Sequence, residues 1–255
     1  MSSPLRPNIH FKVNHQLSKL IKPNSKICSY FLYDGNVELS LNKIGHSVFG
    51  VTDKDTIFNF WNSVLCDPET LSNYVKFVFN KLTIKELYGL QNNWWEQNNK
   101  RMVNSLFFIL NNCSSLGYAS CGKININKIN KFCFHKLKHF KVSNFSVFYG
   151  KNKQNNIDYN LLPIGEYSHN IFEQGKNKGP EMYTFNHKEI HARVKDLDKK
   201  CILLYKNHPA LFNLYKSFNI KMVDKYGRVA DNKESCEDLI ITNFWTYLNR
   251  TNGKN

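Results

Sequence analysis

The chain has 255 residues, of which 42% are hydrophobic and 14% aromatic, so it can bury a core in one large domain or one domain with an insertion. Because it has no run of about 18 apolar residues and no apolar N-terminal leader, we expect neither a transmembrane helix nor secretion. The seven cysteines form no C-x-x-C pair. Their scatter predicts reduced thiols in an intracellular, reducing compartment, the cytoplasm or nucleus.

Positive charge is in large excess: 35 lysines and arginines stand against 20 aspartates and glutamates, a net charge of +15. DNA or another nucleic acid is the expected partner, because each phosphate that a lysine neutralises releases a counterion. Two alternative origins of the charge remain open. The first is an A/T-rich genome, which favours lysine codons without any partner. The second is a partner other than nucleic acid, namely an acidic protein or a membrane surface. We expect no membrane partner.

Strands and helices alternate in the first part of the chain. The patterns predict helices over 11–21, 37–44 and 55–65, a helix beginning at Pro68, and buried strands over 26–33 and 46–53. Proline is favoured in the first turn of a helix. This alternation predicts an α/β fold with a parallel sheet.

The composition changes after this part. Trp94-Trp95, an Asn- and Lys-rich run and an apolar helix over 102–110 predict an inserted, basic, mostly helical subdomain over residues 88–141. Residues 1–87 and 142–248 are expected to form the α/β domain, and residues 249–255 a flexible tail.

The alternation then resumes. The sequence predicts a strand over 144–150, loops over 151–156 and 173–182, a helix over 187–197, a strand over 201–206, a helix over 209–218 and strands near 220–226 and 238–244.

One short stretch, "SYFLYDGNVELSL" (residues 29–41), indicates a candidate binding loop. It predicts a strand end, a tight turn at Asp34-Gly35 and a helix start. Many α/β enzymes hold a nucleotide-like cofactor at such a turn. Tyr33, however, stands where such a turn usually has another glycine.

Several segments resemble the Dam-type family of adenine-specific DNA methyltransferases in their order and spacing. They are "SPLRPN", "YFLYDGNVEL", "VTDKDTIFNFW" with "DPETL", and "LFNLYKSFNI" with "EDLIITNF". The resemblance spans almost the whole chain. It implies a Rossmann-like methyltransferase sheet that binds S-adenosylmethionine, with the insertion as a DNA-recognition subdomain and methylation of a flipped adenine.

The resemblance also assigns cofactor-binding positions, which we interpret as vestigial. Lys12 matches a lysine near the cofactor, Phe31 and Gly35 fit the glycine-rich loop, and Asp53 matches a carboxylate that binds the adenosine. Tyr33 replaces a loop glycine. Because a glycine allows close approach of the backbone to a ligand, the resemblance implies a loop that is closed by Tyr33 and Asp34.

The catalytic D-P-P-Y motif of that family falls on Pro163-Ile164-Gly165-Glu166. Pro163 supplies no side-chain acceptor for the adenine amine, and Ile164 and Gly165 cannot stack on the base. Losing each preorganised partner typically lowers the rate by about 10²–10³-fold. We therefore predict a catalytically inactive, methyltransferase-like pseudoenzyme without a cofactor, acting as a nucleic-acid-binding or structural subunit.

Alternatives to this prediction remain. A divergent but active enzyme would use S-adenosylmethionine, with Asp158, Asn160 and Glu166 as the suspected side chains. A third hypothesis is a protein-interaction scaffold. The nucleic-acid-binding subunit could also work beside an active methyltransferase-like subunit or within a larger complex.

The basic residues of the insertion are the predicted nucleic-acid contacts: Lys100, Arg101, Lys123, Lys128, Lys131, Lys136, Lys138 and Lys141. Aromatic residues between them suit stacking on bases, or else they form the core of the subdomain. The family's guanine-binding arginine is missing from residues 110–125. Since lysine contacts to phosphates specify little sequence, we predict non-specific or shape-dependent binding.

No metal site is predicted. His187 and His191 lie one helical turn apart, but Lys188 replaces the acid of a zinc helix. Cys133, His135 and His139 lack a second cysteine.

Overall fold

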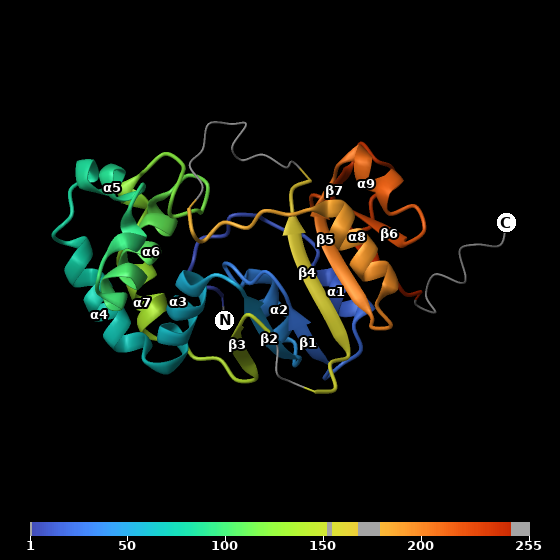
Figure 1. Cartoon of the computed structure of the whole chain (residues 1–255), viewed down its shortest axis with the longest axis horizontal. Helices are drawn as coiled ribbons and strands as arrows, with labels where there is room; N and C mark the ends of the chain where they lie inside the picture. Colours follow the sequence, from blue (N-terminus) through green and yellow to red (C-terminus); the bar gives the residue numbers. More distant parts are fainter. Residues whose placement is uncertain (1, 152–154, 168–178, 246–255) are drawn as a thin grey trace.

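The computed structural model describes residues 2–151, 155–167 and 179–245, which form a seven-stranded sheet flanked by helices (Figure 1). The strand order is β3-β2-β1-β4-β5-β7-β6. The strands are β1 (Lys26–Ser29), β2 (Ser47–Thr52), β3 (Phe145–Tyr149), β4 (Tyr159–Gly165), β5 (Cys201–Lys206), β6 (Asn219–Asp224) and β7 (Cys236–Thr242). The predicted tail, residues 249–255, and parts of the two predicted loops lie outside the described residues.

The sheet is mostly parallel, as the sequence predicted. β1 pairs in parallel with β2 and with β4, so that Ile27 lies between Val48 and Tyr159. β7 is antiparallel to both β5 and β6. Strands β1 to β6 therefore all run the same way, and their carboxyl ends share one edge of the sheet, which we call the carboxyl edge.

The helices are α1 (Asn14–Leu20), α2 (Asn36–Lys43), α3 (Asp55–Cys66), α4 (Pro68–Phe79), α5 (Ile84–Leu90), α6 (Lys100–Cys113), α7 (Lys131–Lys138), α8 (His187–Asp196) and α9 (Pro209–Leu214). Apart from α5 and α7, for which no range was predicted, they lie close to the ranges expected from the sequence. Short 3-10 helices span Trp94–Glu96 and Ile126–Lys128. β1 ends earlier than the predicted residue 33, because Phe31 has a positive φ of 60° that no regular strand allows.

Local capping explains where several helices begin. The Asp67 side chain accepts a hydrogen bond from the Thr70 N–H, and Pro68 follows at the first helical position of α4. Thr83 and Glu86 form a capping box at the start of α5.

Two hydrophobic clusters hold the layers together. Because successive strand residues point to opposite faces, Ile202 and Leu204 of β5 join one cluster, whereas Leu203 and Tyr205 join the other. The first cluster includes residues of α1 and continues into α3, α4 and α6. The second contains residues of α8 and α9.

Helices α3 to α7, which we call the helical region, connect β2 to β3 (Figure 1). In this region α4 packs on α7: the Ser72 Oγ donates to the Phe134 carbonyl at 2.9 Å, and the Phe79 and Phe134 rings lie 5.7 Å apart. Trp94 is fully buried, and its Nε1–H donates to the Ser120 Oγ at 2.9 Å. Residue 87, the last residue of the predicted first α/β segment, lies within α5, and α4 packs on both α6 and α7.

None of the helices in the described part of the chain is both long enough and apolar enough to cross a membrane.

Candidate functional site

The carboxyl edge between β1 and β4 is the candidate site. The strand order reverses there, with β2 and β3 on one side of β1 and with β4 and β5 on the other. In open α/β sheets, ligands bind outside the carboxyl ends of the strands at such a switch point. The loop 30–35 follows β1 at this position and leads into α2.

Two residues of the loop 30–35 have left-handed backbone conformations, Phe31 (φ 60°) and Gly35 (φ 72°). Gly35 precedes the first residue of α2 and lies against Trp61 of α3: a Cβ atom there would come within 2.7 Å of the Trp61 ring. Gly35 is therefore required both by its conformation and by close packing.

The Tyr33 ring is directed into the helical region. It packs against Phe107 of α6 and against Tyr118, with ring centroids 6.0 and 5.3 Å away, and its hydroxyl donates to the Gly117 carbonyl at 3.0 Å. The side chain is buried, and burial raises the pKa of its hydroxyl well above the usual value. Tyr33 thus joins the sheet to α6.

Asp34 places a carboxylate at the start of α2. Its Oδ1 accepts a hydrogen bond from the Asn36 N–H at 2.8 Å, and its Oδ2 accepts one from the Asn8 N–H at 3.3 Å. Burial raises the pKa of this carboxyl to about 6 despite these bonds. The N-terminus of a helix favours an anion, and in this protein Asp34 already supplies one.

A second buried carboxyl lies behind the loop. The Ser29 Oγ at the end of β1 donates to the Glu38 Oε1 of α2 at 2.7 Å. Burial raises the pKa of Glu38 to about 7, and the nearby charge of Asp34 also contributes.

The N-terminal segment, residues 3–12, crosses the carboxyl edge from the helical region toward β7 (Figure 1). The Ser3 Oγ donates to the Asp34 carbonyl, and the Ile9 side chain occupies the space in which a Cβ on Gly165 would lie. Farther along, the His10 carbonyl accepts a hydrogen bond from the Lys206 Nζ at 2.8 Å.

Lys12 ends this segment away from the loop 30–35. Its N–H donates to the buried Asp238 near the start of β7 at 2.5 Å, while its side chain is exposed. Asp238 also accepts from the Lys206 Nζ at 2.6 Å. The structure therefore places the predicted cofactor lysine near the end of β5 and the start of β7.

A second stretch, residues 182–187, covers the carboxyl edge with aromatic rings, and we call it the aromatic segment. The Tyr183 hydroxyl donates to the Leu32 carbonyl at 2.9 Å and lies 2.5 Å from the Thr52 Oγ1 at the end of β2. Phe185 packs edge-on against Phe31, with centroids 4.9 Å apart. The Trp61 Nε1–H donates to the Tyr33 carbonyl at 2.8 Å. Together with the bonds from Tyr183 and Ser3, the carbonyls of Leu32, Tyr33 and Asp34 therefore all accept hydrogen bonds from protein side chains.

Asp53 follows β2 at the carboxyl edge, where the resemblance expects it. Its side chain is exposed. Burial raises the pKa of the Tyr183 hydroxyl, and the charge of Asp53 raises it further. Of the predicted cofactor residues, Phe31, Gly35 and Asp53 lie at this part of the edge, next to the aromatic segment.

The four residues at the catalytic-motif position end strand β4. Pro163 and Ile164 lie within the strand, Gly165 is its last residue with a φ of 92°, and Glu166 follows, exposed. Ile164 is 3% exposed and packs in the second hydrophobic cluster. The only carboxylate among these four positions is that of Glu166.

Two of the suspected side chains of the active alternative lie at the opposite edge. The Asp158 Oδ2 accepts a hydrogen bond from the N–H of Lys26, the first residue of β1. Asn160 is buried near the start of β4, and its Nδ2–H donates to the Cys201 Sγ at 3.9 Å. A seven-residue strand is about 23 Å long, so only Glu166 remains near the candidate site.

A cluster of aromatic and imidazole rings, which sequence reasoning missed, follows β4. Tyr167 lies next to both His187 and His208, with each imidazole centroid 4.7 Å from its own ring centroid. The His187 Nδ1 lies 3.1 Å from the Tyr205 hydroxyl, which lies 3.2 Å from the Tyr215 hydroxyl. These residues come from separate segments of the chain, so no local spacing could have revealed the cluster.

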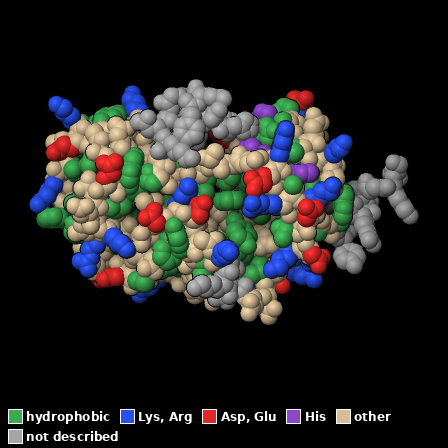
Figure 2. Space-filling view, in the orientation of Figure 1, with side chains coloured by type: hydrophobic (Ala, Val, Ile, Leu, Met, Phe, Trp, Pro, Cys, Tyr) green, Lys and Arg blue, Asp and Glu red, His purple; other side chains and the backbone are tan. Residues whose placement is uncertain are grey.

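The predicted basic contacts are spread through the helical region. Lys100 and Arg101 begin α6, whereas Lys123 and Lys128 lie beyond its end, and a helix of 14 residues is about 21 Å long. Lys138 pairs with Glu69 of α4 at 2.7 Å. Lys131 and Lys141 are exposed, and Lys136 is half-buried. Figure 2 shows basic side chains dispersed over the visible face with acidic side chains between them.

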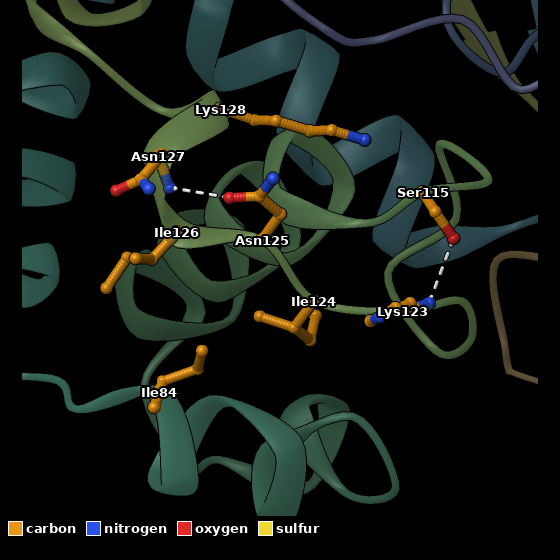
Figure 3. A pocket seen from close by; sticks show the side chains of 8 residues that line it. All are labelled: Ile84, Ser115, Lys123, Ile124, Asn125, Ile126, Asn127 and Lys128. Carbon is orange, nitrogen blue, oxygen red and sulfur yellow. Dashed lines mark hydrogen bonds between the residues drawn. The ribbon is translucent and has the colours of Figure 1, made fainter.

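Lys123 and Lys128 share a hollow of about 320 Å³ on the helical region (Figure 3). Its other lining residues are Ile84, Ser115, Ile124, Asn125, Ile126 and Asn127. Ile84 lies opposite Ile124 and Ile126, so part of the wall of the hollow is aliphatic.

The metal candidates are not arranged for coordination. In residues 2–151, 155–167 and 179–245, no three His, Cys, Asp or Glu side chains form a metal-binding group. The His135 and His139 rings lie 4.3 Å apart and are tilted by 51°, and the Cys133 Sγ–H donates to the Lys128 carbonyl at 3.6 Å.

The strand order, with β7 antiparallel between β5 and β6, is that of a Rossmann-like methyltransferase fold. No family model and no curated protein matches the chain. Among solved structures, the chain is similar to a TehB-like SAM-dependent methyltransferase from Corynebacterium glutamicum ATCC 13032 Kitasato. The two share 7% sequence identity at a TM-score of 0.39, over 91% of this chain and 86% of that one. A likeness of this size adds nothing to the argument about function.

Proposed function

We propose that this chain is a catalytically inactive protein of the methyltransferase-like fold, which binds nucleic acid and does not use S-adenosylmethionine. The observation that carries the proposal is the covering of the carboxyl edge. Residues 3–12 and 182–187 both cross it, and their contacts include the carbonyls of the loop 30–35.

The residues of the loop 30–35 fit S-adenosylmethionine poorly. A ligand would have to displace the Tyr183 hydroxyl from the Leu32 carbonyl or the Ser3 hydroxyl from Asp34. The carboxylate of the ligand would also meet the buried carboxyl of Asp34 at the start of α2. Like charges at such short range in a buried site repel strongly.

The end of β4 supports inactivity as well. The amine of adenine needs a hydrogen-bond acceptor there to become nucleophilic, and Pro163, Ile164 and Gly165 have no polar side chain. The His187 and His208 rings both lie 4.7 Å from the Tyr167 ring, at interplanar angles of 36° and 32°. Tyr167, the aromatic residue that follows the motif, is therefore already in contact with two imidazoles.

The exposed carboxylate of Asp53 favours a second candidate, a divergent methyltransferase that still binds S-adenosylmethionine. Of the three suspected side chains, only Glu166 would lie near the site in that protein. Incubation of the purified chain with duplex DNA and methyl-labelled S-adenosylmethionine separates the two candidates. We expect no label on adenine, whereas label above that of a heat-denatured sample would establish the second.

Nucleic-acid binding is expected to depend steeply on salt. If about six phosphates are contacted, log Kobs should fall against log salt with a slope near −5. A fluorescence anisotropy titration with labelled duplex and single-stranded oligonucleotides, repeated from 50 to 300 mM salt, gives this slope.

The predicted interface on the helical region has a matched control. Replacing Lys100, Arg101 and Lys131 by alanine should make the slope less steep by two to three, since each lost phosphate contact removes about one. Replacing Lys188, Lys195 and Lys199 removes the same charge from exposed positions in and just after α8, and should change the slope little. Equal changes of the salt slope in the two triple variants would contradict an interface on the helical region. If the native chain binds no oligonucleotide at low salt, only the hypothesis of a protein-interaction scaffold remains.

A further inference from the structure

The turn between β6 and β7 presents an exposed aromatic ring with two cations close to it. Tyr226 is 68% exposed, with the Arg228 guanidinium 5.0 Å and the Lys225 Nζ 5.1 Å from its ring centroid. Most exposed large apolar side chains occur singly and need no special role. A ring flanked by an arginine and a lysine, however, suits stacking on a base next to a phosphate.

The turn is held rigidly. The Asp224 Oδ1 accepts hydrogen bonds from the N–H groups of Tyr226 and Arg228 at 2.8 and 2.9 Å, and its Oδ2 pairs with the Arg228 Nε at 3.0 Å. Gly227 has a φ of 82°, and its carbonyl accepts a hydrogen bond from the buried Gln16 side chain at 3.0 Å. A preorganised ring loses little entropy when a base stacks on it.

The turn also lies at the end of a basic path along the carboxyl edge. β6 runs parallel to β5, so its carboxyl end and the turn that follows lie at the same edge. The N-terminal segment connects the turn to the helical region: Arg6 donates to the Ser114 carbonyl at 2.8 Å, and a Cβ on Gly227 would lie 2.7 Å from the Lys12 carbonyl.

Positive charges are close together along this path. Partial burial and the charges of Lys12, Arg6 and Lys206 lower the pKa of His10. Lys206 is partly neutralised by Asp238, at 2.6 Å, whereas Lys12 is exposed next to the turn. A phosphate backbone is the polyanion that matches a row of cations ending at an aromatic ring.

We propose that the β6–β7 turn is a stacking platform for an unpaired base of a single-stranded nucleic acid, whose backbone follows the N-terminal segment from Arg6 to Lys12. This proposal rests on the proposed nucleic-acid binding. It adds that the ligand is single-stranded and that it binds along the N-terminal segment and the β6–β7 turn. In duplex DNA the bases are paired and stacked, so the ring gains nothing from them.

Fluorescence anisotropy with the full chain tests the platform, using fluorescein-labelled oligo(dT), oligo(U) and a duplex of mixed sequence. We expect Tyr226→Ala to weaken binding of the single-stranded probes about 5- to 100-fold and to leave the duplex affinity within twofold. Tyr226→Trp should restore single-strand binding. The oligo(dT) and oligo(U) titrations distinguish DNA from RNA as the better source of the base.

Phe77→Ala is the matched control, because Phe77 of α4 is 53% exposed and also lies next to a lysine, Lys81, at 4.0 Å, and neither residue is among the predicted contacts. We expect this variant to bind all three probes like the native chain. Single-strand binding by Tyr226→Ala within twofold of native, or an equal loss in Phe77→Ala, would overturn the platform while leaving nucleic-acid binding in place. Failure of the native chain to bind any probe would overturn both.

Discussion

Replacing Tyr33 by glycine, which restores the residue type of the family's loop, is expected to destabilise the protein by about 3–5 kcal/mol, the usual range for removing a large buried aromatic ring. The ring is 6% exposed and packs between Phe107 and Tyr118, so its loss leaves a cavity between the sheet and α6. Glycine also adds freedom to the unfolded chain. The midpoint and slope of urea unfolding, followed by circular dichroism, measure the change.

Tyr33→Phe is the control for this substitution. It keeps the ring and removes only the hydroxyl that donates to the Gly117 carbonyl at 3.0 Å. Its expected effect is about 1 kcal/mol, the net value of one hydrogen bond. If Tyr33 only obstructed a ligand site, Tyr33→Gly would instead lose little stability and would gain affinity for S-adenosylmethionine. That result would contradict the placement of the ring in the core.

A fall in stability with rising pH is the second large effect that we expect. Burial raises the pKa of Glu38 from 4.5 to about 7 in the folded protein. The folded state therefore binds more protons than the unfolded state between these two values, so the free energy of unfolding decreases as the pH rises through this window. The loss amounts to about 3 kcal/mol for this shift. Asp34, with a pKa of about 6, acts in the same direction.

Urea unfolding at pH 5 and pH 8 measures this dependence. Glu38→Gln keeps the shape of the side chain and cannot ionise, so we expect it to flatten the dependence and to be more stable than the native chain at pH 8. Asp53→Asn changes an exposed carboxylate at the same edge and should leave the slope as it is. A native protein that is more stable at pH 8 than at pH 5 would contradict the buried, raised carboxyls.

The sequence predicted the sheet well, because its signals are local. Apolar runs such as residues 201–206 and capped helices such as α4 specify their own structure. The end of β1 was predicted too late, because the positive φ of Phe31 leaves no pattern in neighbouring residues.

The candidate site was harder to predict, because its contacts join distant residues. Tyr183 and Leu32 are 151 positions apart, and Lys12 and Asp238 are 226 positions apart. Asp53 could be placed from the end of a predicted strand. Asp158 and Asn160 could not be assigned to an edge until the start of β4 at Tyr159 was known.

The direction of the Tyr33 side chain was also beyond the sequence. A tyrosine in place of a loop glycine suggests an obstruction, but the ring can turn toward either side of the loop. Phe107 and Tyr118 provide an apolar place for it, and the Gly117 carbonyl accepts its hydroxyl proton. The loop carbonyls are engaged by Ser3, Trp61 and Tyr183 instead.

Isothermal titration calorimetry of the purified, folded chain with S-adenosylmethionine tests the closed carboxyl edge most directly. We expect no binding heat up to millimolar ligand, and likewise none with S-adenosylhomocysteine. Saturable binding at micromolar concentration, weakened by Asp53→Asn, would contradict the proposal and show that the edge opens for the methyl donor.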